Sequence, residues 1–338
     1  MLPTFFDTLC RDAYEIRVIC EIRGCFLEKL YLCHLIPKTT KIMKRIILLI
    51  FLLFAMSVQA QPRAKHVVLI GLDGWAAHDL DKAHDIPNIR MLMQGGSVTL
   101  HKRSVLPSSS GVNWASMFMG VGPETHGFTT WDSEQHDLPF AYENAHGIFP
   151  SIFSIIREAY PNAETGCTIE WEPIKYVVDT LAISYMGYLP SSRDSLESNC
   201  DRIVQYIREH KPLFFAPCFD GLDGTGHSAG WYSRDYYDYL ARLDKCIGRI
   251  IQALKDAGIY DETVIIVTGD HGGHDKGHGT LAMEDMESPV VIFGPNVKQG
   301  YPIKAPMVQY DIAATIAYAL GIEIPQVWRG KPAKEAFK

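Results

Sequence analysis

Uninterrupted apolar runs recur along the chain at intervals typical of a protein with a buried β-sheet. The clearest are HVVLIG, which begins at His66, and TVIIV, which begins at Thr263. Short runs of this kind, bounded by glycine or polar residues, predict strands that are buried on both faces. The predicted strands span residues 66–71, 97–104, 165–169, 213–219, 263–267 and 289–293.

Segments with apolar residues at three-to-four-residue spacing separate these runs and predict helices. The longest spans residues 234–257, and the others span 87–94, 112–119, 151–159, 193–210 and 310–320. Strands that alternate with helices favour an α/β fold, with a mostly parallel central sheet covered by helices on both faces. Two segments break the pattern. Asp220–Gly230 is predicted as a glycine-rich loop, and residues 129–150 as a lid or insertion.

The segment Met43–Ala60 has the pattern of a signal peptide. Lys44 and Arg45 precede an apolar stretch, and Val58-Gln59-Ala60 has the small residues of a cleavage site. The alternative is a membrane anchor, but the apolar stretch is shorter than the ~20 residues that span a bilayer. We therefore expect export to the periplasm or the medium without a stable membrane anchor. Residues 61–338 then form one catalytic domain, and 1–42 is expected to be a non-native upstream extension.

Charge and cysteine usage narrow the functional classes. Residues 61–338 carry 24 lysines and arginines against 34 aspartates and glutamates, and no basic stripe indicates a nucleic-acid groove. The domain has four widely spaced cysteines. The sequence does not decide whether they are buried free thiols or form disulfides. They are Cys167, Cys200, Cys218 and Cys246.

Carboxylates and histidines follow three of the predicted strands. The carboxyl ends of parallel strands meet at one edge of a sheet, where α/β proteins bind ligands. One strand end with a carboxylate and a histidine is as well explained by a polar surface loop. Three strand ends of this kind together indicate a two-metal site with two sets of three ligands. Mixed carboxylate and imidazole ligands suit zinc, and manganese or iron less specifically. The candidates are Asp73, Asp223, His227, Asp270, His271 and His278.

Ser110 is the candidate nucleophile. It lies where the loop that begins at Pro107 enters a predicted helix, and a helix N-terminus offers backbone N–H groups to an anion. Serine at this position is also typical of a helix cap. The spacing alone favours neither role for Ser110, the nucleophile or the helix cap.

Five motifs in this order resemble the alkaline phosphatase superfamily, specifically the branch of type I phosphodiesterases and nucleotide pyrophosphatases. They are Gly71-Leu72-Asp73-Gly74, the run from Pro107 through Asn113 to Gly120, Pro123-Glu124-Thr125-His126-Gly127, Asp223…Gly226-His227, and the run from Thr268 to Gly273. The resemblance spans most of residues 61–338.

The resemblance implies a role for each candidate. Asp223, His227 and a later histidine would hold one zinc ion, and Asp73, Asp270 and His271 the other. The later histidine is identified as His278, with His274 as its competitor, and Ser110 becomes the nucleophile. The chain departs from the nucleotide enzymes at two positions, where it has Gly111 after the nucleophile and Trp131 in place of a phosphate-binding asparagine.

The implied function is metal-dependent hydrolysis of a small-molecule phosphate ester, of the phosphodiesterase type, through a phosphorylated serine. Asn113, Trp131 and Trp171 are the candidates for contacting the substrate, and Trp231 is a further aromatic candidate. The alternatives are a phosphomonoesterase, a sulfatase, for which the Cys-x-Pro-x-Arg motif is missing, and a non-catalytic binding module that keeps the fold. The oligomeric state stays open.

Overall fold

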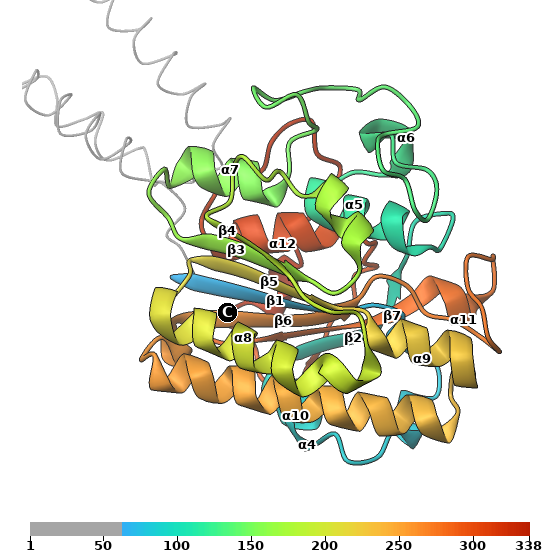
Figure 1. Cartoon of the computed structure of the whole chain (residues 1–338). Helices are drawn as coiled ribbons and strands as arrows, with labels where there is room; N and C mark the ends of the chain where they lie inside the picture. Colours follow the sequence, from blue (N-terminus) through green and yellow to red (C-terminus); the bar gives the residue numbers. More distant parts are fainter. Residues whose placement is uncertain (1–62) are drawn as a thin grey trace, which may run out of the picture. The chain divides into compact units, whose positions relative to one another are not determined.

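A computed structural model describes residues 63–338 of the protein (Figure 1). The predicted signal peptide, residues 43–60, and the segment 1–42 before it lie outside the described residues. None of the helices between residues 63 and 338 combines the length and the hydropathy needed to cross a membrane.

The centre of the structure is an eight-stranded sheet with the strand order β4-β3-β5-β1-β6-β7-β2-β8. Of the strands described, only β7 runs opposite to the rest, because it pairs antiparallel with both β6 and β2. The mostly parallel sheet predicted from the sequence is therefore confirmed. The strands are β1 (His66–Leu72), β2 (Ser97–Arg103), β3 (Thr165–Ile169), β4 (Tyr185–Tyr188), β5 (Phe214–Phe219), β6 (Thr263–Gly269), β7 (Glu287–Phe293) and β8 (Tyr301–Pro302).

Helices cover both faces of this sheet, as Figure 1 shows. Successive residues of β1 enter different cores, because side chains on a strand alternate between faces. Val67 and Leu69 pack with the first set of helices, and Val68 and Ile70 with the second. The first set is α5 (Ser110–Met119), α7 (Ile152–Ala159) and α12 (Asp311–Ala319), and the second is α4 (Pro87–Gly95), α8 (Leu196–His210) and α10 (Arg234–Asp256).

The prediction of a loop at 220–230 is wrong, because Gly221–Ala229 forms the helix α9. Glycine weakens a helix intrinsically, but here it allows close packing. A Cβ atom at Gly221 would lie 2.0 Å from the hydroxyl of Tyr239, and one at Gly226 would lie 2.7 Å from the ring of Trp231. Local composition thus predicts a loop where tertiary packing requires a helix.

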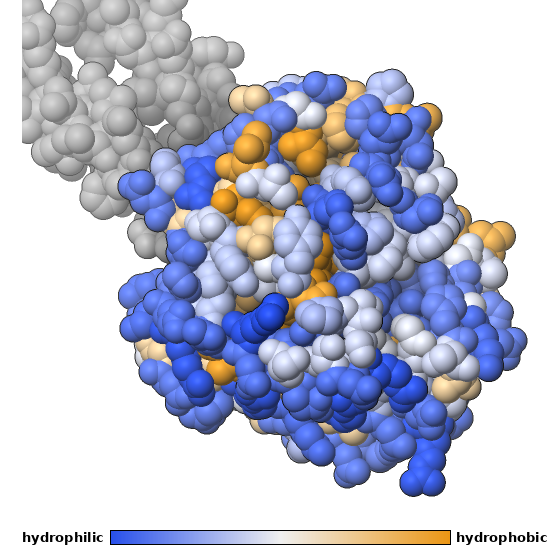
Figure 2. Space-filling model, in the orientation of Figure 1, coloured by the Kyte–Doolittle hydropathy of each residue, from blue (hydrophilic) through white to orange (hydrophobic). Residues whose placement is uncertain are grey.

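The short edge strand β4 was also not predicted, because its sequence, YMGY, has no apolar run. On the face drawn in Figure 2, hydrophobic side chains gather in the area of α7 and β4, and most of the remaining surface is hydrophilic.

The four cysteines between residues 63 and 338 are all buried and unbridged, so the free-thiol alternative holds in this structure.

The predicted insertion, residues 129–150, contains turns and irregular segments but no helix or strand, and most of it is exposed. Its second half is attached to the buried carboxylate of Asp179. The amide of Asn144 donates to that carboxylate at 2.9 Å, and Nδ1 of His146 also lies 2.9 Å from it. A role for this segment as a lid stays a prediction.

The end of β1 packs against the ring of Trp114 in α5. Gly71 makes this possible, because a Cβ atom there would lie 2.3 Å from the indole ring. The same indole donates its Nε1–H to Asp73 Oδ2 at 2.9 Å. The packing of α5 on β1 therefore also fixes the first carboxylate of the candidate site.

We predict that Gly71→Ala lowers the free energy of unfolding by about 1–3 kcal/mol, because the added methyl group overpacks against Trp114. Gly224→Ala is the control. Its added Cβ meets no atom within 4 Å, and alanine in α9 should raise stability by about 0.5–1 kcal/mol over glycine. Denaturant unfolding measures both changes. Equal stabilities for the two variants would contradict this account of Gly71.

Candidate metal centre

The candidate ligands meet at the carboxyl edge of the sheet because β5, β1 and β6 are neighbours in it. Asp73 follows β1, while Asp270 and His271 follow β6. Asp223 lies on α9, directly after β5. Ligand atoms approach within 4.8 Å of one another in two groups. These groups are Asp73, Asp270 and His271, and Asp223, His271 and His278.

The histidines of this centre direct Nε2 toward carboxylates. Nε2 of His271 lies 3.4 Å from oxygens of both Asp73 and Asp270, and Nε2 of His278 lies 3.6 Å from Asp223 Oδ1. The Nδ1 atoms are each hydrogen-bonded to a backbone carbonyl. The acceptors are Gly272 for His271 (2.7 Å), Ser108 for His278 (3.0 Å) and Lys276 for His227 (3.0 Å). Such bonds fix the tautomer that leaves Nε2 free to bind a metal.

Three buried carboxylates give the centre more negative charge than its surroundings compensate. Burial raises the pKa of Asp270 to about 6. Burial and the charges of neighbouring aspartates hold the pKa values of Asp73 and Asp223 well above their usual range. Burial also lowers the pKa of His271 to about 4, so this histidine is neutral at pH 7 and offers a lone pair.

Two carboxylate oxygens are buried without a hydrogen-bond partner in the part of the chain that the structure describes. They are Oδ1 of Asp223 and Oδ2 of Asp270. The other oxygen of Asp270 accepts two backbone N–H groups, from Gly74 at 3.0 Å and from His271 at 2.8 Å. Buried polar atoms are normally satisfied. Unpartnered oxygens beside Nε2 atoms therefore fit divalent cations as their missing partners.

The structure separates the three remaining histidine candidates. His278 lies in the centre, whereas His274 pairs with Asp285, its Nδ1 atom 2.6 Å from the carboxylate. His227 lies at the rim, with its side chain 46% exposed and Nε2 3.4 Å from Asp223 Oδ2. It is outside both tight groups of ligand atoms, so its ring would have to move to complete the second set.

The Ser110 hydroxyl faces the centre. Its Oγ lies 3.1 Å from Nε2 of His271 and 3.5 Å from Oδ1 of Asp73. The structure also corrects the capping alternative, because the N-cap of α5 is Ser109 and Ser110 is the first helical residue. The N–H of Gly111 donates to the carbonyl of Trp131 at 2.9 Å, so that group is already engaged.

Asn113 is placed differently from the expectation that it contacts substrate. It is fully buried, and its side chain holds the loop before α5. Its Oδ1 accepts the N–H of Val105 at 2.8 Å, and its Nδ2 donates to carbonyls including that of Ser109 at 2.9 Å. With its polar atoms engaged, Asn113 shapes the Ser110 loop, and the substrate-binding assignment finds no support.

Two tryptophans stack at the rim near Ser110. The rings of Trp131 and Trp171 are 6.3 Å apart with an interplanar angle of 21°, and Trp131 is 58% exposed. Trp231, in contrast, is buried. Its ring centroid lies 5.2 Å from that of His227, and its Nε1 donates to the carbonyl of Gly74 at 3.0 Å. It supports the ligands and does not offer a surface to a substrate.

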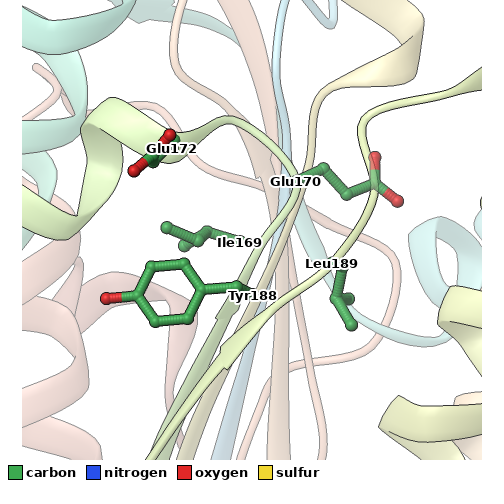
Figure 3. A pocket seen from close by; sticks show the side chains of 5 residues that line it. All are labelled: Ile169, Glu170, Glu172, Tyr188 and Leu189. Atoms are coloured by element: carbon green, nitrogen blue, oxygen red, sulfur yellow. The ribbon is translucent and has the colours of Figure 1, made fainter.

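A cavity of about 390 Å³ opens at the carboxyl ends of β3 and β4. In Figure 3, the lining side chains of Tyr188, Ile169 and Glu172 lie to the left of the strand ends, and those of Glu170 and Leu189 lie to the right. Trp171 lies between the two glutamates in the sequence but does not itself line the cavity. None of the candidate metal ligands lines it.

Glu170 was not singled out in the sequence, although it supports the helix that carries Asp223. It is 6% exposed. One of its oxygens accepts the N–H of Asp220, the N-cap residue of α9, at 2.9 Å, and the other accepts Nδ2 of Asn199 at 2.7 Å. A carboxylate at a helix N-terminus is favourable, but its burial raises the pKa of Glu170 to about 7.

Comparisons with known proteins identify the family to which the chain is similar. A family model described as "Type I phosphodiesterase / nucleotide pyrophosphatase" matches residues 67–289. The chain is 25% identical over 224 residues to bis(5'-adenosyl)-triphosphatase enpp4 of Mus musculus, covering 62% of this chain and 47% of that protein. It is 32% identical over 141 residues to GPI ethanolamine phosphate transferase 1 of Chaetomium globosum, covering 35% and 15%.

Solved structures show the same fold. Murine ectonucleotide pyrophosphatase/phosphodiesterase 5, an inactive form in complex with AMP, matches with a TM-score of 0.66 at 15% identity, covering 81% of this chain and all of that one. A 2-O GAG sulfatase matches with a TM-score of 0.63 at 13% identity, covering 80% and 73%. The fold is that of the alkaline phosphatase superfamily. The chain spans about half the length of the first curated relatives it matches.

We predict that Glu170 makes stability fall as pH rises. The pKa of Glu170 is about 7 in the folded protein, above the value of 4.5 in the unfolded chain. Its contribution to the free energy of unfolding is therefore fully present below pH 4.5 and is lost as pH rises through about 7. The loss should approach about 3 kcal/mol.

Denaturant unfolding of wild type and Glu170→Gln between pH 5 and 8 measures this difference, in the same metal-free buffer. Glu172→Gln removes an exposed carboxylate nearby and controls for the loss of charge itself. Parallel pH profiles for wild type and Glu170→Gln would rule out the effect.

Proposed function

The chain belongs to the type I phosphodiesterase/nucleotide pyrophosphatase family, and from this premise we propose that it is a metal-dependent hydrolase of phosphate diesters. The observation that carries the proposal is the position of Ser110. Its hydroxyl lies within 3.5 Å of Asp73 Oδ1 and of His271 Nε2, two of the candidate ligand atoms. A hydroxyl at this point can attack a phosphorus atom whose oxygens face the same cations.

Two divalent cations are part of this proposal, and the ligand chemistry favours zinc. Asp73, Asp270 and His271 would hold one, and Asp223, His278 and, after a movement of its ring, His227 would hold the other. When bound, the cations would offset charge on the phosphoryl oxygens and lower the pKa of the Ser110 hydroxyl. The neutral histidines and the unpartnered oxygens of Asp223 and Asp270 support this assignment.

The protein's own residues then carry out two displacements at phosphorus. Ser110 Oγ gives its proton to solvent and attacks, forming an Oγ–P bond as the bond to the leaving alcohol breaks. The departing oxygen takes a proton from water. A second water attacks the phosphoserine, the P–Oγ bond breaks, and Ser110 regains its proton. The position of Ser110 at the start of α5 places the developing charge at a helix N-terminus.

The surroundings of Ser110 favour a diester over a monoester. A terminal phosphate carries extra negative charge, and monoesterases need a cationic side chain to match it. Arg103, the nearest arginine in the sequence, pairs with Glu287 at 3.1 Å. Lys276, in the loop between the ligands, donates to the carbonyl of Ser228 at 2.8 Å. Both cations are engaged away from Ser110.

The second substituent of the diester would rest on the stacked rings of Trp131 and Trp171 and reach the cavity beside Tyr188. Because Gly111 replaces the aromatic residue of the nucleotide enzymes, this surface replaces theirs in the proposal. Export of the enzyme, as expected from residues 43–60, is part of the same proposal. A binding module without catalysis would have no need for the Ser110 hydroxyl at this point.

We predict that Ser110→Ala lowers kcat roughly 10³-fold or more, because the nucleophile is removed. Bound zinc, measured by elemental analysis, should stay close to the wild-type content, since Ser110 is not in either ligand group. The change in stability should be below ~1 kcal/mol, because Ser109 occupies the N-cap.

Ser109→Ala is the matched control and should keep most of the activity. If Ser109→Ala or Ser108→Ala is the inactive variant while Ser110→Ala turns over normally, the nucleophile is misassigned.

The substrate preference tests the proposed function directly. We expect kcat/KM for bis-p-nitrophenyl phosphate to exceed that for p-nitrophenyl phosphate at the same pH and metal concentration, because the extra charge of the monoester meets no free cation. A clear preference for the monoester would assign the protein to phosphatases instead. Turnover of neither ester by metal-loaded protein would favour the binding-module alternative.

A further inference from the structure

Lys102 is a fully buried lysine behind the candidate metal centre, and no motif in the sequence singles it out. Its ammonium donates to the carbonyl of Gly269 at 2.6 Å and to Oε1 of Gln309. Within residues 63–338, no carboxylate oxygen lies within 4.0 Å of its Nζ. Burying a charged group among neutral acceptors is unfavourable, so a lysine at this point of β2 calls for a functional reason.

The first contact of Lys102 fixes the peptide before a candidate metal ligand. Gly269 is the last residue of β6 and directly precedes Asp270. Its carbonyl is held by Lys102 and also accepts the hydroxyl of Ser288 at 3.3 Å. On the other side, Asp270 Oδ1 accepts the N–H of Gly74 at 3.0 Å. The peptide before Asp270 and the carboxylate of Asp270 are thus each held by hydrogen bonds.

The second contact reaches the helix that presents Ser110. Gln309 is fully buried, and its Nε2 donates to the carbonyl of Asn113 in α5 at 3.2 Å. Because Oε1 of the same amide accepts from Lys102, one hydrogen-bonded chain joins the end of β6 to α5. That chain links the ligand Asp270 to the element whose position sets the distance from Ser110 to the centre.

The charge of Asp270 also reaches Lys102. Burial lowers the pKa of the Lys102 ammonium to about 7, and the carboxylates of Asp270 and Asp311 act in the opposite direction. The ammonium in turn favours the ionised form of Asp270. Both effects agree with the geometry, in which a cationic donor stands behind the ligand.

We propose that Lys102 is a positioning residue for this site, acting through the Gly269–Asp270 peptide and, by way of Gln309, through the helix that carries Ser110. This inference rests on the proposed function, since it requires Asp270 to hold a cation and Ser110 to attack. A purely structural lysine would instead contribute to folding alone. An apolar side chain of the same length could replace it without any specific effect on the metal or on turnover.

The test compares Lys102→Met, which keeps most of the length but removes the donors and the charge, with wild type. Cobalt(II) added to metal-free protein reports affinity and coordination geometry through its visible spectrum. We expect the Kd for cobalt(II) to rise about 10–100-fold, as for other residues that orient metal ligands. We also expect kcat for bis-p-nitrophenyl phosphate to fall with KM nearly unchanged. Ile292→Ala, a fully buried apolar change in β7, is the control for destabilisation.

A wild-type cobalt(II) affinity and spectrum in Lys102→Met would overturn the inference, as would an equal loss of affinity in Ile292→Ala. If Lys102→Met does not fold, Gln309→Met is the variant that tests the inference. A fall in kcat with cobalt(II) binding retained supports the link to α5, and a wild-type kcat overturns it. Failure of wild type itself to bind cobalt(II) would instead reject the proposed metal-dependent function on which the inference rests.

Discussion

Uncompensated negative charge at the carboxyl edge of the sheet is the constraint on which the rest of the site depends. Asp73, Asp223 and Asp270 are almost completely withdrawn from water. Close carboxylates in such an environment repel one another and lose hydration, which is strongly unfavourable without compensation. The protein supplies part of that compensation through the Trp114 indole, through backbone N–H groups and, at greater distance, through Lys102. The remaining deficit is what the proposed pair of cations would offset.

The convergence of the ligands was predictable because it follows from topology. In a parallel sheet, each strand delivers its next residue to the same edge, so a carboxylate after an apolar run is placed without any knowledge of side-chain contacts. Asp73 after β1 and Asp270 after β6 are the clearest cases. The predicted strands and most helices of the α/β fold agree with the structure for the same reason, since burial on two faces leaves a strong apolar signal.

What the sequence did not reveal depends on contacts between side chains that residue type and spacing do not specify. The helix at Gly221–Ala229 exists because its glycines receive the rings of Tyr239 and Trp231, and composition alone describes it as a loop. Lys102 and Gln309 are 207 residues apart, and neither has a local motif. Asn113 lies in one of the family motifs, but its side-chain amide is hydrogen-bonded to the backbone of the loop before α5. Residue type and spacing report what a side chain can do, whereas its neighbours decide what it does.

The order of the strands has a consequence for folding. The three strands that deliver the ligands are adjacent in space, yet Asp73 and Asp270 are separated by most of the described chain. Contacts of such long range form late, because the intervening loop must first be closed. The centre therefore does not exist in any fragment that lacks β1 or β6, and the proposed cations could bind only after the middle of the sheet has assembled. Occupancy by metal would then report completion of the whole fold, and it would stabilise the finished protein over every earlier species.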